Sequence, residues 1–200
     1  PDFVQNATHP VVKVSWFDAN AFCKWLTEKE HDEGVIEDRQ FYRLPTDLEW
    51  SAAVGLTEEA GFTPMERDGK VKDLYPWGRQ WPPPAGAGNF GDVSTKSQFP
   101  ELTVIEGYSD GFAATAPVGS FAANTFGLHD LEGNVREWCE DLYDGEEQHR
   151  VVVRDGQRVH VGGQRIQRGG AWHDAASGSV LSSARRCFFP NGAGAHLGFR

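Results

Sequence analysis

The 200-residue sequence is poor in cysteine, and its three cysteines, Cys23, Cys139 and Cys187, are an odd number. Such a set is poor material for a disulfide framework and favours a reducing compartment. Pro1 opens the chain without a signal peptide or an initiator methionine, so we expect a processed or truncated piece. A leader removed upstream would leave the same sequence, and therefore a cytoplasmic and a surface-displayed location both stay open.

Basic residues are also scarce, because 19 Lys and Arg face 29 Asp and Glu, giving a formal net charge of −10. No run of Lys or Arg supplies the basic footprint that phosphate binding needs, so nucleic acid is excluded as an expected partner. No apolar run approaches the roughly 20 residues of a membrane span. An acidic surface fits solubility, or the binding of hard cations at a few places.

What the sequence does contain is typical of a folded domain. Hydrophobic residues make up 39% and tryptophan occurs seven times, which argues against disorder. Twenty-three glycines and eleven prolines predict many turns. No repeat and no long linker divides the chain, so we expect one domain over residues 1–200.

Two helices are predicted, both early in the chain. The segment VSWFDANAFCKWLTEKE has Ser15 as a candidate N-cap. Its apolar stripe consists of residues with helical spacing: Ala19, Phe22, Cys23 and Leu26. In LPTDLEWSAAVG, Thr46 and Glu49 have the spacing of a capping box, and Gly55 can end the helix.

Later segments favour strands and loops. Short strands are predicted in RVVVR, RVHVGG, RIQRGGAW and LGFR, with Asp155-Gly156 as a hairpin turn. The fold class is therefore α+β, with two helices, a small antiparallel sheet and many ordered loops. Long loops in a small domain are uncommon unless something holds them in place.

Calcium could hold them, at the segment HDLEGNVREW. Alternate residues of an extended segment share a side, so the carbonyls of Gly133 and Val135 and the carboxylate of Glu137 could converge, with Asp130 completing the set. Calcium binds this mixture of carboxylates and carbonyls. The alternative is a tight turn with solvated acids, which the spacing taken alone favours.

The order of motifs along the chain resembles the formylglycine-generating enzyme (sulfatase-modifying factor) family. The motifs are HPVVKVSWFDANAFCKWL, YRLPTDLEWSAAV, YPWG, GNF, DGFAATAPVGSFAANTFGLHDLEGNVREWCEDLY, RGGAW and LGFR. The resemblance covers almost the whole chain and implies a C-type-lectin-like fold whose usual N-terminal portion is not visible before Pro1. It also implies two structural calcium sites. One falls on Asp130, Gly133, Val135 and Glu137, and the other on Asn89, Phe90, Asp110 and Phe112.

The resemblance does not extend to the catalytic residues of the family's oxidase, which holds copper through two cysteines between RGGAW and GFR. This sequence has Ser179 and Ser182 near those places, and a hydroxyl cannot replace a thiolate toward Cu(I). Cys187 has no thiol partner in the segment, so no copper and no catalytic residue are expected. An iron-dependent branch of the superfamily uses a His-x3-His-x-Glu pattern, which is absent. An oxidase or non-haem-iron enzyme stays open as the alternative.

A third branch, the variable proteins of diversity-generating retroelements, fits better. In these proteins RGG-small-aromatic and GFR frame a segment rewritten by adenine mutagenesis, which does not yield Lys, Glu, Gln, Met or Trp. Residues 173–200 contain none of these five, although residues 107–131 also contain none.

The resemblance to variable proteins predicts that residues 173–198 form a variable surface for a protein or other macromolecular ligand. Aromatic anchors and small polar groups suit such a surface. The candidate contact residues are His173, Asp174, Ser177, Ser179, Leu181, Ser183, Arg186, Cys187, Phe188, Phe189, Asn191, Ala193 and His196. Arg185, Arg200 and Trp172 are expected to belong to the supporting frame, although each of Phe188 and Phe189 could instead pack under the loop.

Overall fold

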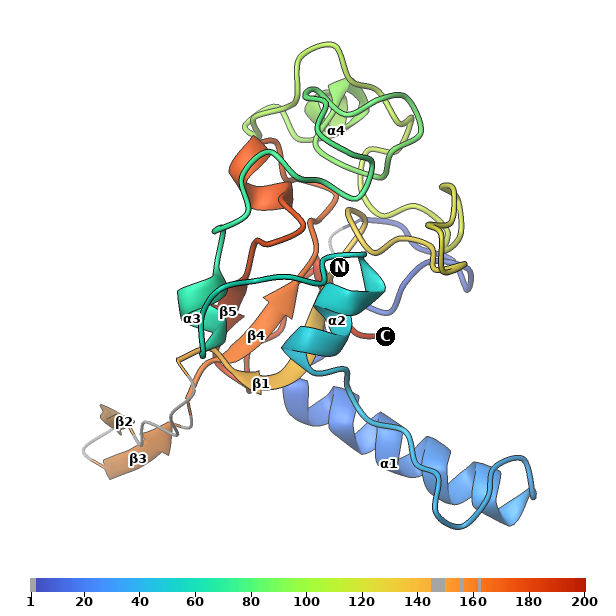
Figure 1. The fold of residues 1–200 in the computed structure, drawn as a ribbon, viewed down its shortest axis with the longest axis vertical. Coiled ribbons are helices and arrows are strands. Elements are labelled where there is room, and N and C mark those ends of the chain that lie inside the picture. Colours follow the sequence, from blue (N-terminus) through green and yellow to red (C-terminus); the bar gives the residue numbers. More distant parts are fainter. Residues whose placement is uncertain (1–2, 145–149, 155–156, 162) are drawn as a thin grey trace.

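A small four-stranded sheet lies at the centre of the computed structural model, which describes residues 3–144, 150–154, 157–161 and 163–200 (Figure 1). Its strands, in spatial order, are β5 (Arg186–Phe188), β4 (Arg165–Arg168), β1 (Arg136–Leu142) and β6 (Leu197–Gly198). Residues 173–200, which we name the C-terminal segment, therefore supply both edge strands. A separate antiparallel pair consists of β2 (Arg150–Arg154) and β3 (Gln157–Val161). The Asp155-Gly156 turn expected between them lies outside the described residues.

The α+β class is confirmed, but the sheet is mixed rather than antiparallel. Strand β4 runs antiparallel to β1 and β5, whereas β6 runs parallel to β1. The chain leaves β5 at one edge and crosses to the other edge before forming β6, so β6 runs in the direction of β1. A sequence pattern can predict that a strand exists, but it does not predict whether the strand runs parallel or antiparallel to its neighbour.

The two early helices form where they are predicted. Helix α1 (Trp16–Asp32) begins with a capping box between Ser15 and Asp18, and α2 (Asp47–Ala53) begins with one between Thr46 and Glu49. Helix α1 extends away from the sheet (Figure 1). Its predicted stripe is therefore buried only in part: Ala19 and Cys23 are buried, whereas Phe22 is 44% exposed.

Three short helical segments have no counterpart in the sequence predictions. They are α3 (Pro64–Arg67), α4 (Val93–Gln98) and the 3₁₀ turn η1 (Ser177–Val180). Segments of four to six residues are too short to show an apolar period. The capping box of Thr63 and Glu66 was the available signal for α3.

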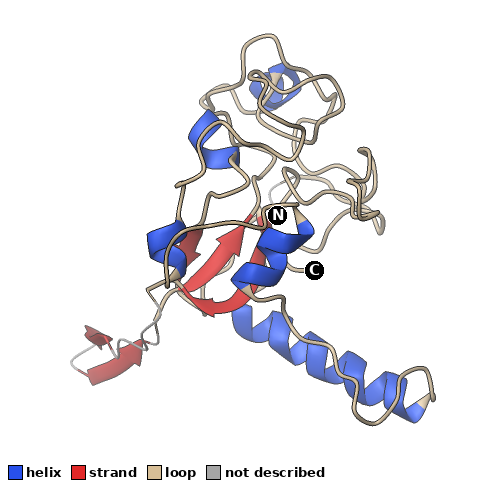
Figure 2. Cartoon of the chain, viewed as in Figure 1, coloured by secondary structure: helices blue, strands red, loops and turns tan. Residues whose placement is uncertain are grey.

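Loops make up most of the remaining molecule, and Figure 2 shows them filling the half that lies beyond the sheet. Three clusters of buried apolar side chains lie among the described residues. One cluster packs α1 against Trp138 and Leu197, and a second packs Trp50 of α2 against Ile166. The third cluster lies among the loops and consists of Tyr75, Phe90, Ile105, Tyr108, Val180 and Leu181.

A buried charge cluster ties α2 to the sheet and to the C-terminal segment. Asp47, at the start of α2, is fully buried and forms ion pairs with Arg67, Arg168 and Arg185. Arg185 also pairs with Glu59. Burial opposes ionisation of Asp47, but the three guanidinium groups leave its pKa lowered overall. This carboxylate therefore fixes the relative positions of four distant chain segments.

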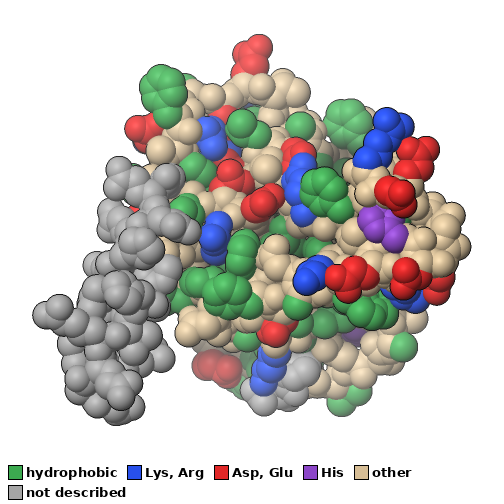
Figure 3. Space-filling model, turned by 90° about the horizontal axis from the view of Figure 1, so that it is seen from below, with side chains coloured by type: hydrophobic (Ala, Val, Ile, Leu, Met, Phe, Trp, Pro, Cys, Tyr) green, Lys and Arg blue, Asp and Glu red, His purple; other side chains and the backbone are tan. Residues whose placement is uncertain are grey.

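The outer surface mixes charged and apolar side chains. On the face shown in Figure 3, acidic and basic side chains lie interspersed among apolar ones. Among the described residues, no helix is both long and apolar enough to cross a membrane.

Candidate functional site

The ends of the C-terminal segment are held firmly by the sheet and the core. Trp172 is buried and its indole N–H donates to the carbonyl of Ala195, 3.3 Å away, so the two ends of the segment contact each other. Arg185 pairs with Asp47, and Arg200 pairs with Glu137 at 2.8 Å. The expectation that these three residues belong to the frame is confirmed.

Between its ends the segment alternates between exposed and buried stretches. After Trp172 it passes through η1, turns inward over residues 180–185 and emerges as the edge strand β5. It then loops over residues 189–196 before β6. The candidate contact residues that are exposed or half-buried are His173, Ser177, Ser179, Arg186, Cys187, Phe188, Phe189, Asn191, Ala193 and His196. We name these ten residues the C-terminal face.

Three of the candidate contact residues are buried and do not lie on this face. Leu181 packs in the apolar cluster with Phe90 and Tyr108. Ser183 exchanges hydrogen bonds with the backbone of Val71, and Asp174 forms a buried ion pair with Arg136. Each of these three side chains therefore belongs to the supporting frame. The sequence of the segment gave no signal that distinguishes them from their exposed neighbours.

Phe188 is the largest exposed apolar side chain of the C-terminal face, at 41% exposure. Its ring lies directly over Gly192, where a Cβ would come within 2.1 Å of a ring carbon. The amide of Gly192 also donates to the carbonyl of Phe189. The glycine thus lets the loop fold closely beneath the Phe188 ring, while part of that ring stays exposed.

A cavity of about 420 Å³ opens beside β5. Arg136 of β1, Gln167 of β4 and Arg186 of β5 line it, together with the ring of His196. The remaining lining residues are Tyr143, Arg185, Cys187 and Phe188. We name this space the β5 cavity. It brings four members of the C-terminal face together with residues of two inner strands.

The charge around the β5 cavity is dominated by guanidinium groups. One Nη2 of Arg136 donates to both carboxylate oxygens of Asp174, at 2.6 and 2.7 Å. Arg186 approaches the same carboxylate at 3.8 Å and donates to the hydroxyl of Ser179. One acid therefore faces two basic side chains.

Two histidines, from the two ends of the segment, pack against each other beside these arginines. The ring centroids of His173 and His196 lie 4.8 Å apart. Burial, followed by repulsion from Arg136 and His173, lowers the pKa of His196 to about 4. Burial also lowers the pKa of His173. Both rings are therefore neutral at physiological pH, and the described residues leave the buried Nδ1 of His173 without a hydrogen-bond partner.

The segment contains hydroxyls and one thiol. Ser182 is buried, while Ser179 accepts a hydrogen bond from Arg186. The thiol of Cys187 lies 3.2 Å from the side-chain oxygen of Gln164, and burial raises its pKa. Cys23, Cys139 and Cys187 are all free. A raised pKa reduces thiolate character, which both nucleophilic chemistry and copper binding require.

The first candidate calcium site is brought together in part. Asp130, Val135 and Glu137 line a second cavity of about 420 Å³. One oxygen of Asp130 accepts from the amide of Gly119, while its Oδ1 is buried with no partner among the described residues. The Glu137 carboxylate accepts from Trp50 and Arg200. A cation here would have to share Glu137 with the Arg200 guanidinium.

Gly133, the fourth residue of that set, has a second role. Its φ of +83° lies in the left-handed region, and a Cβ there would come within 2.5 Å of the carbonyl oxygen of Asn89. This close approach joins the first candidate calcium site to the second, because Asn89 belongs to the second.

At the second candidate calcium site, the GNF and SDGF segments lie side by side. The Asp110 carboxylate accepts from the amides of Phe90 and Phe112, at 2.8 and 2.9 Å. Burial raises the pKa of Asp110 to about 6. Asn89 is fully buried, and its Oδ1 has no partner among the described residues. An unpaired oxygen beside a buried carboxyl suits a bound cation.

No group of three or more His, Cys, Asp or Glu side chains within the described part of the chain is placed to hold a metal ion. Half of the donors expected at each calcium site are backbone carbonyls, which lie outside such a group of side chains. The unpaired oxygen of Asn89 and the buried Asp110 carboxyl are donors of the kind that calcium binds, whereas at the first site Arg200 already occupies one oxygen of Glu137.

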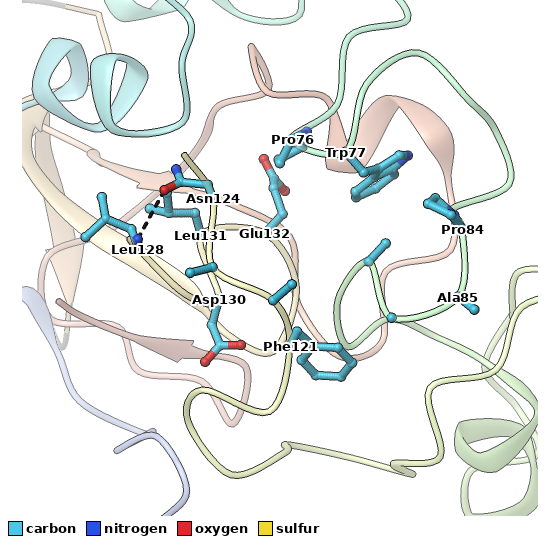
Figure 4. A pocket seen from close by; sticks show the side chains of 14 residues that line it. Pro76, Trp77, Pro84, Ala85, Phe121, Asn124, Leu128, Asp130, Leu131 and Glu132 are labelled. Carbon is cyan, nitrogen blue, oxygen red and sulfur yellow. Dashed lines mark hydrogen bonds between the residues drawn. The ribbon is translucent and has the colours of Figure 1, made fainter. Parts of the chain in front are cut away.

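A further pocket, of about 270 Å³, has no counterpart in the sequence predictions. Figure 4 shows Trp77 and Pro84 on one side of it, Phe121 below, and Asn124 and Glu132 opposite. Burial raises the pKa of Glu132 well above its usual value. Its lining residues come from loops that are distant in sequence and meet only in the tertiary structure, so no local sequence pattern predicts this pocket.

Known proteins resemble the chain at the level of both sequence and fold. A formylglycine-generating enzyme of Thermomonospora curvata is 32% identical over 197 residues, which are 96% of this chain and 54% of that protein. A Bos taurus protein named inactive C-alpha-formylglycine-generating enzyme 2 is 32% identical over 196 residues, covering 96% and 49%. The chain thus spans about half the length of these curated relatives.

Solved structures share the fold at lower identity. PvdO from Pseudomonas aeruginosa matches with a TM-score of 0.61 and 21% identity, over 100% of this chain and 63% of that one. Treponema denticola variable protein 1 matches with a TM-score of 0.57 and 21% identity, over 98% and 71%. Residues 1–200 match the family described as the Sulfatase-modifying factor enzyme 1-like domain, and the chain belongs to that family.

Proposed function

We propose that this chain is a non-catalytic ligand-binding protein that displays a variable C-terminal surface on a C-type-lectin-like scaffold, as a retroelement variable protein does. The observation that carries the proposal is the division within the segment: its frame residues are buried and paired, while the C-terminal face is open. Side chains held on a rigid frame lose little conformational entropy on binding. The fold shared with Treponema denticola variable protein 1 supports this assignment.

The chemistry of the segment supports a binding role over an oxidase role. Copper-dependent oxidation in this family needs two thiolates, and the segment has Cys187 alone between RGGAW and GFR. Ser182 is buried against the frame, and Ser179 is engaged by Arg186. A Bos taurus relative that carries the word inactive in its name shows that the family includes members without the activity.

Calcium is proposed as the structural cation of the scaffold. Asn89 and Asp110 would hold it with the carbonyls of Phe90 and Phe112. At the other site Asp130 and Glu137 would hold it with the carbonyls of Gly133 and Val135. Each site has one buried side-chain oxygen without a partner among the described residues, on Asn89 and on Asp130. A cation there would replace the packing that these loops lack.

The alternative function is that of an enzyme, because a relative at 32% identity is named formylglycine-generating enzyme. Purified protein offered Cu(I) and a cysteine-containing peptide decides between the two. We expect no stoichiometric copper and no oxygen-dependent turnover of the peptide. Tight copper binding with turnover would establish the oxidase and refute the binding proposal, and stoichiometric iron would favour the non-haem-iron enzyme.

The binding proposal also predicts where the segment tolerates change. Randomising the exposed positions Ser177, Arg186, Asn191 and Ala193 in a displayed library should leave most variants folded, because exposed changes usually alter stability by less than about 0.5 kcal/mol. Randomising the buried positions Leu181 and Ser183 as a control should unfold most variants. If randomising the exposed positions unfolds as many variants as randomising the buried positions, the C-terminal face does not tolerate variation and the proposal is contradicted.

Neighbouring DNA offers a second test. A near-copy of the terminal codons beside a reverse transcriptase, with adenines at the differing positions, would support the retroelement assignment. A neighbouring sulfatase would weigh against it.

A further inference from the structure

The β5 cavity has a basic lining in a protein whose net charge is −10. We propose that this cavity binds a single carboxylate group of a ligand through Arg186 and Arg136, with Gln167 beside them. The inference rests on the proposed function, because it names the chemistry that the C-terminal face would recognise.

None of the residues that line the β5 cavity is acidic, and three are arginines. Arg185 is already neutralised, because its guanidinium pairs with the buried carboxylates of Asp47 and Glu59. Arg136 and Arg186 share the one carboxylate of Asp174. Two guanidinium groups beside the cavity therefore share one carboxylate, while two further acids, Asp68 and Asp144, act on the thiol of Cys187 in the same lining.

Arg136 is the more deeply placed of the two. Its side chain is 8% exposed, and its Nη2 is occupied by Asp174. Its Nε is buried and has no hydrogen-bond partner among the described residues. A buried donor without a partner costs about 1–3 kcal/mol, and more when it is charged. A ligand oxygen would recover that cost by accepting a hydrogen bond from this Nε–H.

Arg186 lies at the mouth of the cavity with a side chain that is 45% exposed. The hydroxyl of Ser179 holds its Nη2 at 2.7 Å, which fixes the direction of the guanidinium plane. Arginine presents several N–H groups in a planar fork that matches a carboxylate. A ligand carboxylate can therefore meet Arg186 first and Arg136 behind it.

The strand register holds these groups in place. Arg186 pairs with Gln167 across β4 and β5, and Gln167 pairs with Trp138 across β4 and β1. Arg136 precedes Trp138 by two positions, so alternation along β1 puts it on the same face. Three adjacent strands thus present two guanidinium groups and one amide toward a single space before any ligand arrives.

The two guanidinium groups that share Asp174 favour a singly charged anion. A carboxylate carries one negative charge, which together with Asp174 balances Arg136 and Arg186. Phosphate carries more than one charge near neutral pH and would leave unpaired negative charge beside buried Asp174. We therefore assign the cavity to a monoanionic carboxylate, from either an acidic side chain or the C-terminus of a partner chain.

The test follows the His196 ring by NMR, because this ring lines the cavity. The probes are N-acetylglutamate α-amide, its neutral match N-acetylglutamine amide, and N-acetylalanine, which carries a main-chain carboxylate. We expect a saturable shift of the His196 Cε1–H signal with at least one carboxylate probe and at least tenfold weaker binding of the glutamine compound. Comparing N-acetylalanine with the glutamate probe tells which carboxylate source fits.

Variants keep the test specific. Arg186→Gln should weaken binding of the carboxylate probe at least tenfold, whereas Arg39→Gln, at an exposed arginine paired with Glu37, should not change it. Thermal unfolding should show both variants folded. The proposal is overturned if neither carboxylate probe gives a saturable shift, if the glutamine compound binds equally, if inorganic phosphate binds more tightly, or if Arg186→Gln has no effect.

Failure here and failure of the proposed function give different results. If no carboxylate probe binds in the β5 cavity but the exposed positions tolerate randomisation, only the carboxylate assignment is refuted. Carboxylate binding together with copper-dependent turnover of a cysteine peptide removes the binding proposal but leaves the anion site.

Discussion

Arg185 and Asp47 lie 138 positions apart in the sequence and meet inside the protein, where Nε of Arg185 donates to Oδ1 of Asp47 at 3.0 Å. Both side chains are fully buried. Arg67 and Arg168 converge on the same carboxylate. A single acid thus holds the start of α2 against the C-terminal segment, so the position of the C-terminal face depends on a residue far from it in the sequence.

Asp47→Asn should destabilise the fold strongly. It keeps the shape of the side chain but removes the charge that three buried guanidinium groups face, and breaking a buried pair costs about 3–5 kcal/mol. Glu49→Gln serves as the control, because Glu49 pairs with Arg43 at the surface, where such pairs contribute about 0–1 kcal/mol. Urea unfolding of the two variants measures the difference, and equal losses would contradict this account.

Gly133→Ala should disrupt the junction of the two candidate calcium sites. The new methyl group would come within 2.5 Å of a backbone oxygen of Asn89, which cannot swing aside as a flexible side chain can. Gly127→Ala is a matched control, since its φ of +79° is similar and nothing lies within 4 Å of its Cβ. We expect about 1–2 kcal/mol for the control from its φ alone, and a clearly larger loss at Gly133. Similar losses would show that backbone strain, and not contact, dominates.

Calcium should raise the melting temperature of the purified protein, and a chelator should lower it. The reason is that a ligand that binds only the folded state stabilises it by mass action. Asp110→Asn should reduce this response, because it removes the charged donor of the second site and leaves the first site intact. Differential scanning calorimetry with and without calcium measures the effect. An unchanged melting temperature in wild-type protein would refute the calcium assignment.

Acidification should destabilise the protein through His196. The unfolded chain takes up a proton near pH 6.5, whereas the folded state keeps this ring neutral down to about pH 4. The contribution of the neutral His196 ring to the free energy of unfolding is therefore fully present above pH 6.5 and is lost as the pH falls toward 4. The groups facing the ring are Arg136, His173, Asp174 and Arg186.

For this partly buried ring we expect a loss of about 1–3 kcal/mol between pH 7 and pH 4. His196→Asn should make the fall in stability shallower, as measured by urea unfolding at several pH values. Part of the slope should remain, since His173 contributes in the same direction. Identical slopes in the two proteins would show that His196 is not the titrating group.

Local signals in the sequence determined where α1 and α2 begin. The capping boxes at Ser15 and Thr46 form as predicted, because each needs only residues three positions apart. The family resemblance likewise rests on short motifs, and residues 1–200 do belong to that family. The pairing of Arg185 and Arg200 with carboxylates also followed from their places in those motifs.

The tertiary structure alone decided which residues of the C-terminal segment face outward. Leu181 and Ser183 are buried while Arg186 is exposed, although all three lie in one irregular stretch without a period. It also decided that β6 runs parallel to β1, and that Arg136 and Arg186 share one acid. The physical reason is that each of these features depends on contacts between segments distant in sequence, whereas a cap or a turn is fixed by the backbone groups next to it.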